Sequence, residues 1–317
     1  MRSDGGADQA EGLRRLLVLN QTQVITVVAG KTGVGRTSAT INLAAALARS
    51  GKDVLVLDEN HGPNNLLDRM GMSGRHDLLD VAQGKCGLCE AINTINEFGI
   101  LSTARAMQAL AKLDQAGQQR LENALTEASD SVDVVLIDAA MSVLSQAEGL
   151  AGKSVAVSPR AMSPSLASGA ALLVLVEATP SGITESYALI KRLALKNTRQ
   201  QFGIAVNKAG NEQAALTVFE NMDKVARRNL SVRLEYLGHI PSDERLKCAM
   251  QLGKSVVEAF PDAASTKSYL ELSQKLLCLP MQRDEAEGGI STIIQNLMRQ
   301  VSQPAALTQY CEASGAG

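Results

Sequence analysis

One glycine-rich segment restricts the fold of this chain more than any other feature: Gly30-Lys31-Thr32-Gly33-Val34-Gly35-Arg36-Thr37. It begins where the β-branched run 24–30, predicted as a buried strand, ends, and it leads into residues 36–50, predicted as a helix. Small residues at such a junction let backbone N–H groups converge on phosphate oxygens, and the start of the helix adds partial positive charge. The spacing is that of a Walker A phosphate-binding loop, with Arg36 where a lysine is usual.

This loop supplies most of the candidate ligands for a nucleotide and its metal ion. We expect its backbone, with the side chains of Lys31 and Arg36, to hold the phosphates of ATP or ADP. Ser38 extends this set into the first turn of the helix, and Thr37 is placed to offer its hydroxyl to Mg²⁺. The alternative is a degenerate loop that no longer binds nucleotide.

Strand-like and helix-like segments alternate along the chain, which predicts a doubly wound, mainly parallel α/β sheet with helices on both faces. The predicted strands are 24–30, 53–58, 98–103, 132–138, 171–179, 202–207 and 234–241. The predicted helices are 36–50, 121–128, 185–195, 212–228, 243–252 and 265–279. We expect a nucleotide-binding domain over 21–280, a short helical segment within 1–20, and a linker, an amphipathic helix and a tail over 281–317.

Composition argues against a nucleic-acid partner. The 317 residues include 31 basic and 33 acidic ones, aromatics are 3% and Trp is absent, so neither a polyelectrolyte nor a base-stacking surface is expected. The polar start resembles no leader peptide and no apolar run is long enough to span a bilayer, so we expect a cytoplasmic protein. The CxxC pair Cys86 and Cys89 is either coincidental or a redox or metal motif.

Several positions resemble the deviant Walker A ATPases, the family that includes MinD and ParA. Lys31 is similar to the family's second loop lysine, which implies that it reaches across a nucleotide-sandwich homodimer. Residues 54–60 resemble the switch I strand, and the strand ending at Asp138 resembles Walker B, whose acid orients Mg²⁺ through water. Asn207 is similar to the residue that reads adenine, and Pro241 to the loop that lines the base. The resemblance implies a P-loop NTPase fold and ATP hydrolysis.

The N-terminal segment resembles one subfamily more specifically. Its residues match the DQAxxLR signature of the flagellar number regulators FlhG/FleN, and residues 235–261 are similar to that subfamily too. This resemblance implies control of flagellar number and placement, flagellar basal-body or regulatory proteins as partners, and stimulation of a signal-recognition-type GTPase, FlhF, in which Gln9 is offered to the partner's active site. The implied partner-activating residues are Asp8, Gln9, Ala10, Leu13 and Arg14.

Three departures from the family pattern concern γ-phosphate chemistry. Arg36 replaces the loop lysine, and its planar fork is no point-charge substitute. Asn60 stands where the family has the switch I aspartate, and an amide cannot accept a proton from water as a carboxylate can. Ser142 stands where a glycine is usual after the Walker B acid. Of the implied catalytic set Lys31, Asn60 and Asp138, one member is thus altered, and we expect nucleotide binding with weak or lost hydrolysis.

The C-terminal segment 289–301 carries an apolar stripe at helical spacing, formed by Ile290, Ile293, Ile294, Leu297, Met298 and Val301. It resembles the membrane-targeting helix of the MinD group, which implies peripheral membrane contact. A helix that docks on its own domain or on a dimer partner fits the same stripe, since Arg299 is its only basic residue.

Three functions therefore remain open from the sequence. The first is a nucleotide-gated switch that dimerises with ATP and is released by slow hydrolysis. The second is a non-hydrolysing adaptor that acts through its N-terminal segment and its surface. The third is a partition- or division-type ATPase, against which the segment 8–14 argues.

Overall fold

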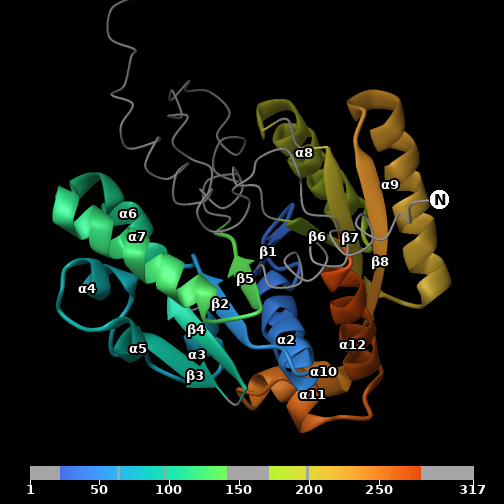
Figure 1. The fold of residues 1–317 in the computed structure, drawn as a ribbon. Coiled ribbons are helices and arrows are strands. Elements are labelled where there is room, and N and C mark those ends of the chain that lie inside the picture. Colours follow the sequence, from blue (N-terminus) through green and yellow to red (C-terminus); the bar gives the residue numbers. More distant parts are fainter. Residues whose placement is uncertain (1–21, 63–64, 96, 141–170, 198–199, 280–317) are drawn as a thin grey trace, which may run out of the picture.

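The computed structural model describes residues 22–62, 65–95, 97–140, 171–197 and 200–279. These residues build an eight-stranded sheet in the order β3-β4-β2-β5-β1-β6-β7-β8 (Figure 1). All neighbouring strands are parallel except β3 and β4, which confirms the predicted doubly wound, mainly parallel architecture. The strands are β1 (Gln23–Ala29), β2 (Val54–Asp58), β3 (Ile92–Ile95), β4 (Phe98–Ser102), β5 (Val134–Asp138), β6 (Ala171–Glu177), β7 (Gln201–Ala209) and β8 (Arg233–Pro241).

Helices cover both faces of the sheet. The long ones are α2 (Arg36–Arg49), α7 (Gln115–Asp130), α8 (Pro180–Asn197), α9 (Glu212–Leu230) and α12 (Ala264–Leu277). The shorter ones are α3 (Leu66–Arg69), α4 (Leu78–Ala82), α5 (Leu88–Ala91), α6 (Ala104–Ala109), η1 (Leu110–Lys112), α10 (Glu244–Gln251) and α11 (Val256–Ala259).

Strand β1 contributes side chains to the apolar clusters on both faces of the sheet. Its residues Ile25 and Val27 are fully buried in the cluster that also contains α2 and α12. The flanking Val24 and Val28 point to the other face, where Val24 joins the cluster that contains α4 and α7 and Val28 joins the cluster that contains α8 and α9. Because successive side chains of a strand alternate between faces, a strand buried on both must be apolar throughout. This explains why the run before the glycine-rich loop contains so many aliphatic residues.

The strand order places the ends of distant segments together. Strand β1 lies between β5 and β6, and both pairs are parallel, so the carboxyl ends of the central strands meet at one edge of the sheet. In open α/β sheets this edge, where the chain reverses its direction of winding, is where ligands bind. The segments after β1, β2, β5, β6 and β7 all start there.

The region 66–112 departs most from the sequence prediction, which foresaw only one strand in it. The structure contains β3, α3 to α6 and η1 there, and β3 pairs with β4 in antiparallel orientation as an edge strand. These helices have three to six residues, too few for a recognisable apolar period. Side-chain caps stabilise α3 and α4, as where Asp77 accepts hydrogen bonds from the backbone N–H groups of Leu79 and Asp80.

Two predicted helices are longer in the structure. The helix expected over 121–128 is α7 and begins at Gln115, because Asp114 caps it by accepting from the N–H of Gly117. The helix expected over 185–195 is α8 and begins at Pro180, where the fixed φ of proline suits the first turn. The other predicted strands and long helices are present within a few residues of their expected bounds.

Several predicted features lie outside the described residues. These are the partner-activating set at 8–14, the position Ser142 and the apolar stripe at 290–301. Within the residues that the structure describes, no helix combines the length and the apolar character needed to cross a membrane.

Candidate functional site

The glycine-rich loop connects β1 to α2 at the central edge of the sheet. Gly35 has a φ of 100°, a left-handed conformation that residues with a Cβ rarely adopt. Gly30 lies so close to α8 that an added Cβ would come within 2.3 Å of the backbone of Glu185 and Ser186. These two glycines therefore fix the path of the loop, one through its dihedral angles and the other through close packing.

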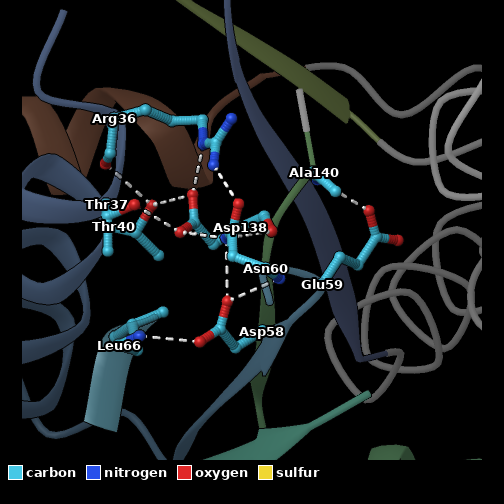
Figure 2. A network of polar contacts seen from close by, with 9 residues as sticks. All are labelled: Arg36, Thr37, Thr40, Asp58, Glu59, Asn60, Leu66, Asp138 and Ala140. Carbon is cyan, nitrogen blue, oxygen red and sulfur yellow. Dashed lines mark hydrogen bonds and ion pairs between the residues drawn. The ribbon is translucent and has the colours of Figure 1, made fainter. Parts of the chain in front are cut away.

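The Arg36 side chain does not extend along the loop but joins a buried polar network (Figure 2). Its Nε donates to Asp138 Oδ1 at 2.6 Å, and its Nη2 donates to Asn60 Oδ1. The Arg36 side chain is 11% exposed and that of Asp138 is 0% exposed. Because β1, β2 and β5 end at the same edge, residues from three separate segments meet here.

The two residues predicted to bind Mg²⁺ lie together. The Thr37 hydroxyl donates to Asp138 Oδ2 at 2.8 Å, and Thr37 is buried. The carboxylate, however, also accepts hydrogen bonds from Arg36 on Oδ1 and from Asn60 on Oδ2. The donor set suits a divalent cation, but in this arrangement a guanidinium already neutralises the carboxylate, so an ion would have to displace it.

Asn60 uses both ends of its amide in this network. Its Nδ2 donates to Asp58 Oδ1 and to Asp138 Oδ2, each at 2.8 Å, while its Oδ1 accepts from Arg36. Asp58 and Asp138 occupy the same register on β2 and β5, and both are fully buried. Burial, followed by the charge of Asp138, raises the pKa of Asp58 from 3.8 to about 6. Asn60 thus bridges two buried carboxyl groups that would otherwise repel each other.

Lys31 forms a second cluster at the opposite end of the loop, which we call the Glu177 latch: Lys31, Glu177, Ser181 and Lys208. Lys31 Nζ lies 2.6 Å from Glu177 Oε2 and 2.9 Å from Ser181 Oγ. Lys208 Nζ lies 2.7 Å from Glu177 Oε1 and donates to the carbonyl of Gly33 at 3.0 Å. Hydrogen bonds from Lys208 and then from Lys31 lower the pKa of Glu177 to about 2. The latch therefore ties Lys31 to its own chain.

Asn207, predicted to read a base, contacts the loop itself. Its Nδ2 donates to the carbonyl of Val34 at 2.7 Å, and its Oδ1 accepts from the N–H of Lys208 at 2.9 Å. Pro241, predicted beside the base, is the last residue of β8 and pairs with Ala209 on β7. The structure thus brings Asn207 and Pro241 to neighbouring strands, with the Asn207 amide bonded to protein groups.

The remaining loop residues have simpler environments. Val34 is buried in the apolar cluster beside α2, whereas Thr32 is exposed and Ser38 is half-buried. The Ser38 carbonyl accepts from Asn42 Nδ2 at 2.7 Å within α2. None of these contacts tests a ligand role, so the predicted contribution of Thr32, Val34 and Ser38 to nucleotide binding stays a prediction.

Sequence reasoning missed Glu177, Lys208 and Glu59. Glu177 is the last residue of β6 and Lys208 the penultimate residue of β7, at the edge where the loop lies, so their position at the carboxyl ends of buried strands was a signal that could have found them. Glu59 lies beside Asp58, and its Oε2 accepts from the N–H of Ala140 at 3.1 Å, just after the Walker B strand (Figure 2). It thereby joins the segments that follow β2 and β5.

Within the described residues, the CxxC pair does not belong to a group of side chains that could hold a metal ion. Cys86 and Cys89 are free thiols, and burial raises the pKa of Cys86. Among the residues with described positions, no group of three or more His, Cys, Asp or Glu side chains could hold a metal ion.

Comparison with known proteins agrees with this geometry. The sequence model described as the CobQ/CobB/MinD/ParA nucleotide binding domain matches residues 25–256. The chain is 30% identical to the antiactivator FleN of Pseudomonas aeruginosa over 90% of its own length and 97% of that protein. It is 26% identical to the flagellum site-determining protein YlxH of Helicobacter pylori, covering 81% of this chain and 82% of that one.

A solved structure shares the fold. The septum site-determining protein MinD of Pyrococcus horikoshii OT3, complexed with Mg-ADP, has a TM-score of 0.57 to this chain at 21% identity. The match covers 81% of this chain and 96% of that one. At this identity the likeness concerns the fold alone.

Proposed function

Because the chain belongs to the MinD/ParA family of nucleotide-binding proteins, we propose that it is an adenine-nucleotide-binding regulator of flagellar number and placement. The observation that carries this proposal is the junction of the loop 30–37 with Asp138 at the central edge of the sheet, where Thr37 and Asp138 share a hydrogen bond. The flagellar part rests on the likeness to FleN and YlxH over most of each chain, together with the segment at 8–14.

The proposed ligands are ATP and ADP. Backbone N–H groups of the loop and the start of α2 provide the phosphate cradle that such ligands require. Asn207 and Pro241, at the ends of β7 and β8, are the proposed contacts of the base. Mg²⁺ held by Thr37 and Asp138 would have to displace Arg36 from the carboxylate.

The proposed partners follow from the segments that flank the domain. Residues 8–14 would stimulate a FlhF-like GTPase, and flagellar basal-body or regulatory proteins would bind the domain. Lys31 would complete a nucleotide-dependent homodimer once it leaves Glu177. The stripe at 290–301 would contact the inner face of the plasma membrane, in keeping with a cytoplasmic protein attached at its periphery.

A second candidate function is favoured by the Arg36 network. Arg36 is bonded to Asp138, and the amide at position 60 cannot accept a proton from attacking water as a carboxylate there could. Such a protein would act as an adaptor that holds nucleotide without hydrolysing it.

Stimulation of the partner GTPase tests the flagellar proposal directly. We would add the full chain to an FlhF-like GTPase and measure GTP turnover, with Gln9→Ala as the variant and Gln21→Ala as the matched control. The proposal predicts that the full chain and the Gln21→Ala protein raise turnover at least about tenfold, whereas Gln9→Ala does not, in line with the usual effect of one positioned polar group. Equal turnover with and without the chain would contradict the proposed partner.

A further inference from the structure

The Asp138 carboxylate is fully provided with hydrogen-bond donors by the protein itself. Oδ1 accepts from Arg36 Nε at 2.6 Å, and Oδ2 accepts from the Thr37 hydroxyl and from Asn60 Nδ2, both at 2.8 Å. Waters bound to a divalent cation would offer the same carboxylate the same kind of hydrogen bond. The protein therefore supplies with its own groups what a hydrated ion usually supplies at this position.

Arg36 and a divalent cation exclude each other at this carboxylate. The Arg36 side chain is only 11% exposed, and Asp138 is fully buried, so water screens their charges poorly. A doubly charged ion beside Asp138 would lie a few ångströms from the guanidinium, where like charges repel strongly. One positive group at a time can therefore neutralise Asp138.

Asn60 completes the hydrogen-bond network of Arg36 and Asp138. Its Oδ1 accepts from Arg36 Nη2, and its Nδ2 donates to both Asp58 and Asp138. An aspartate at position 60 would offer no donor and would place a third carboxylate around a single guanidinium. The amide lets the network close without an additional cation, so the two departures Arg36 and Asn60 support each other.

We propose that the Arg36 guanidinium replaces the divalent cation of this site, so that the chain binds ADP and ATP with an affinity that does not depend on Mg²⁺. The inference rests on the proposed nucleotide binding and specifies the ionic requirement of that same site. A guanidinium has five N–H donors, of which two are used here, and Figure 2 shows the other terminal nitrogen pointing away from Asp138 and Asn60. Those N–H groups remain for phosphate oxygens, which guanidinium binds well.

Titration of the full chain with ADP and with ATP, once with Mg²⁺ and once with EDTA, tests the inference without any variant. Calorimetry should give dissociation constants that agree within about threefold between the two conditions, a difference too small to reflect a lost ionic contact. Tenfold or greater weakening in EDTA would overturn the inference and leave nucleotide binding intact. Absence of binding in both conditions would overturn the proposed nucleotide site, and the inference with it.

Variants at positions 36 and 60 test whether Arg36 is the group that replaces the cation. The double substitution Arg36→Lys/Asn60→Asp frees Asp138 for an ion, so its affinity for ADP should fall at least about tenfold when EDTA replaces Mg²⁺. Arg49→Lys, the same change near the other end of α2, should behave like the wild type. If the double variant and the wild type respond to EDTA alike, Arg36 does not act as the cation.

A measurement without nucleotide gives an independent readout. In Arg36→Ala the buried Asp138 loses its cationic partner, so Mg²⁺ alone should raise the melting temperature of this variant by occupying the carboxylate. The wild-type protein and Arg49→Ala should not respond. A Mg²⁺-dependent rise in the wild type equal to that of the variant would contradict the replacement.

Discussion

The two ends of the glycine-rich loop carry positive side chains in opposite environments. At one end, Arg36 is 11% exposed and bonded to the fully buried Asp138. At the other end, the Glu177 latch holds Lys31 and Lys208, whose side chains are 30% and 47% exposed. Both clusters use a carboxylate at the carboxyl edge of a central strand, and yet they differ in how much water reaches them.

This difference separates a fixed part of the site from an exchangeable part. Exposed ion pairs contribute little to stability and change partners readily, because water replaces each lost contact. Breaking a buried pair by removing one member is costly, because the remaining charge stays away from water. We therefore expect Arg36 to keep its place when ligands bind, and Lys31 to leave Glu177 when another anion or another chain offers a better contact.

The largest effect is expected at the buried end. Arg36→Met should lower the free energy of unfolding by about 3–5 kcal/mol, because Asp138 would remain buried without a cation. Urea denaturation measures the change. Arg49→Met removes an exposed side chain that donates to the carbonyl of Val257, and should cost no more than about 1.5 kcal/mol. Equal losses in the two variants would show that burial of the Arg36 pair has no special energetic role.

Asn60→Asp should have the next largest effect. The substitution replaces a donor shared by Asp58 and Asp138 with a third carboxylate, so we expect a loss of about 1–3 kcal/mol at pH 8. The loss should shrink near pH 5, where protonation relieves the repulsion. Asn65→Asp is a matched control, because Asn65 caps α3 through its side-chain oxygen and aspartate can do the same. A pH-independent loss would contradict the charge explanation.

The free energy of unfolding should depend on pH in opposite directions through Asp58, near one end of the loop, and through Glu177, near the other. Burial raises the pKa of Asp58 from 3.8 to about 6, so the native protein binds this proton more tightly than the unfolded chain does. The resulting stabilisation is complete below pH 3.8 and is lost as the pH rises through about 6, with a size of about 3 kcal/mol. Wild type and Asp58→Asn should therefore differ in the slope of the free energy of unfolding against pH. Urea denaturation between about pH 4 and 7 measures both slopes.

The stabilisation by the Glu177 latch should have the opposite pH dependence. Its lysines lower the pKa of Glu177 from 4.5 to about 2, so the stabilisation is present above pH 4.5 and is lost as the pH falls through about 2. Acid titration of Glu177 by NMR in the wild type and in Lys208→Met should show the pKa rising in the variant. An unchanged pKa would mean that the lysines do not act on this carboxylate in solution.

The smallest effect on stability, and the more informative one for function, is expected for Glu177→Gln. The loss should be about 1 kcal/mol, because both lysines reach water, which screens their attraction for Glu177. Release of Lys31 should nevertheless raise the dimer fraction with ATP severalfold in analytical ultracentrifugation, since the proposed dimer contact no longer competes with the latch. Glu244→Gln, which breaks the exposed pair with Lys247, should leave dimerisation unchanged.

Much of this organisation could be predicted from the sequence. The aliphatic runs before Gly30 and Asp138 are buried on both faces of a parallel sheet, so their pattern is unambiguous and both are central strands. The glycine spacing locates the loop, and the resemblance to the deviant Walker A ATPases points to Asn60, Asp138 and Asn207, which lie at or near the carboxyl ends of β2, β5 and β7. Strand order and patterning alone bring these positions to one edge.

The partners of the charged side chains could not be predicted in the same way. The motif places Arg36 at the start of α2, but whether its guanidinium turns toward phosphate or toward Asp138 depends on the amide at position 60, which lies on another strand. Lys31 and Glu177 meet only because β6 lies next to β1. The short helices of 66–112 were not predicted because three to six residues show no apolar period, and α3 and α4 depend on single side-chain caps.

We propose that the loop 30–37 binds adenine nucleotide and that the Arg36 and Asn60 network prevents its hydrolysis. Calorimetry with ATP, paired with phosphate release on the same sample, tests it for the wild type and for Arg36→Lys/Asn60→Asp. We predict that both proteins bind ATP and that phosphate release appears only in the double variant. Phosphate release by the wild type at the rate of the double variant, or a wild type that does not bind ATP, would contradict the claim.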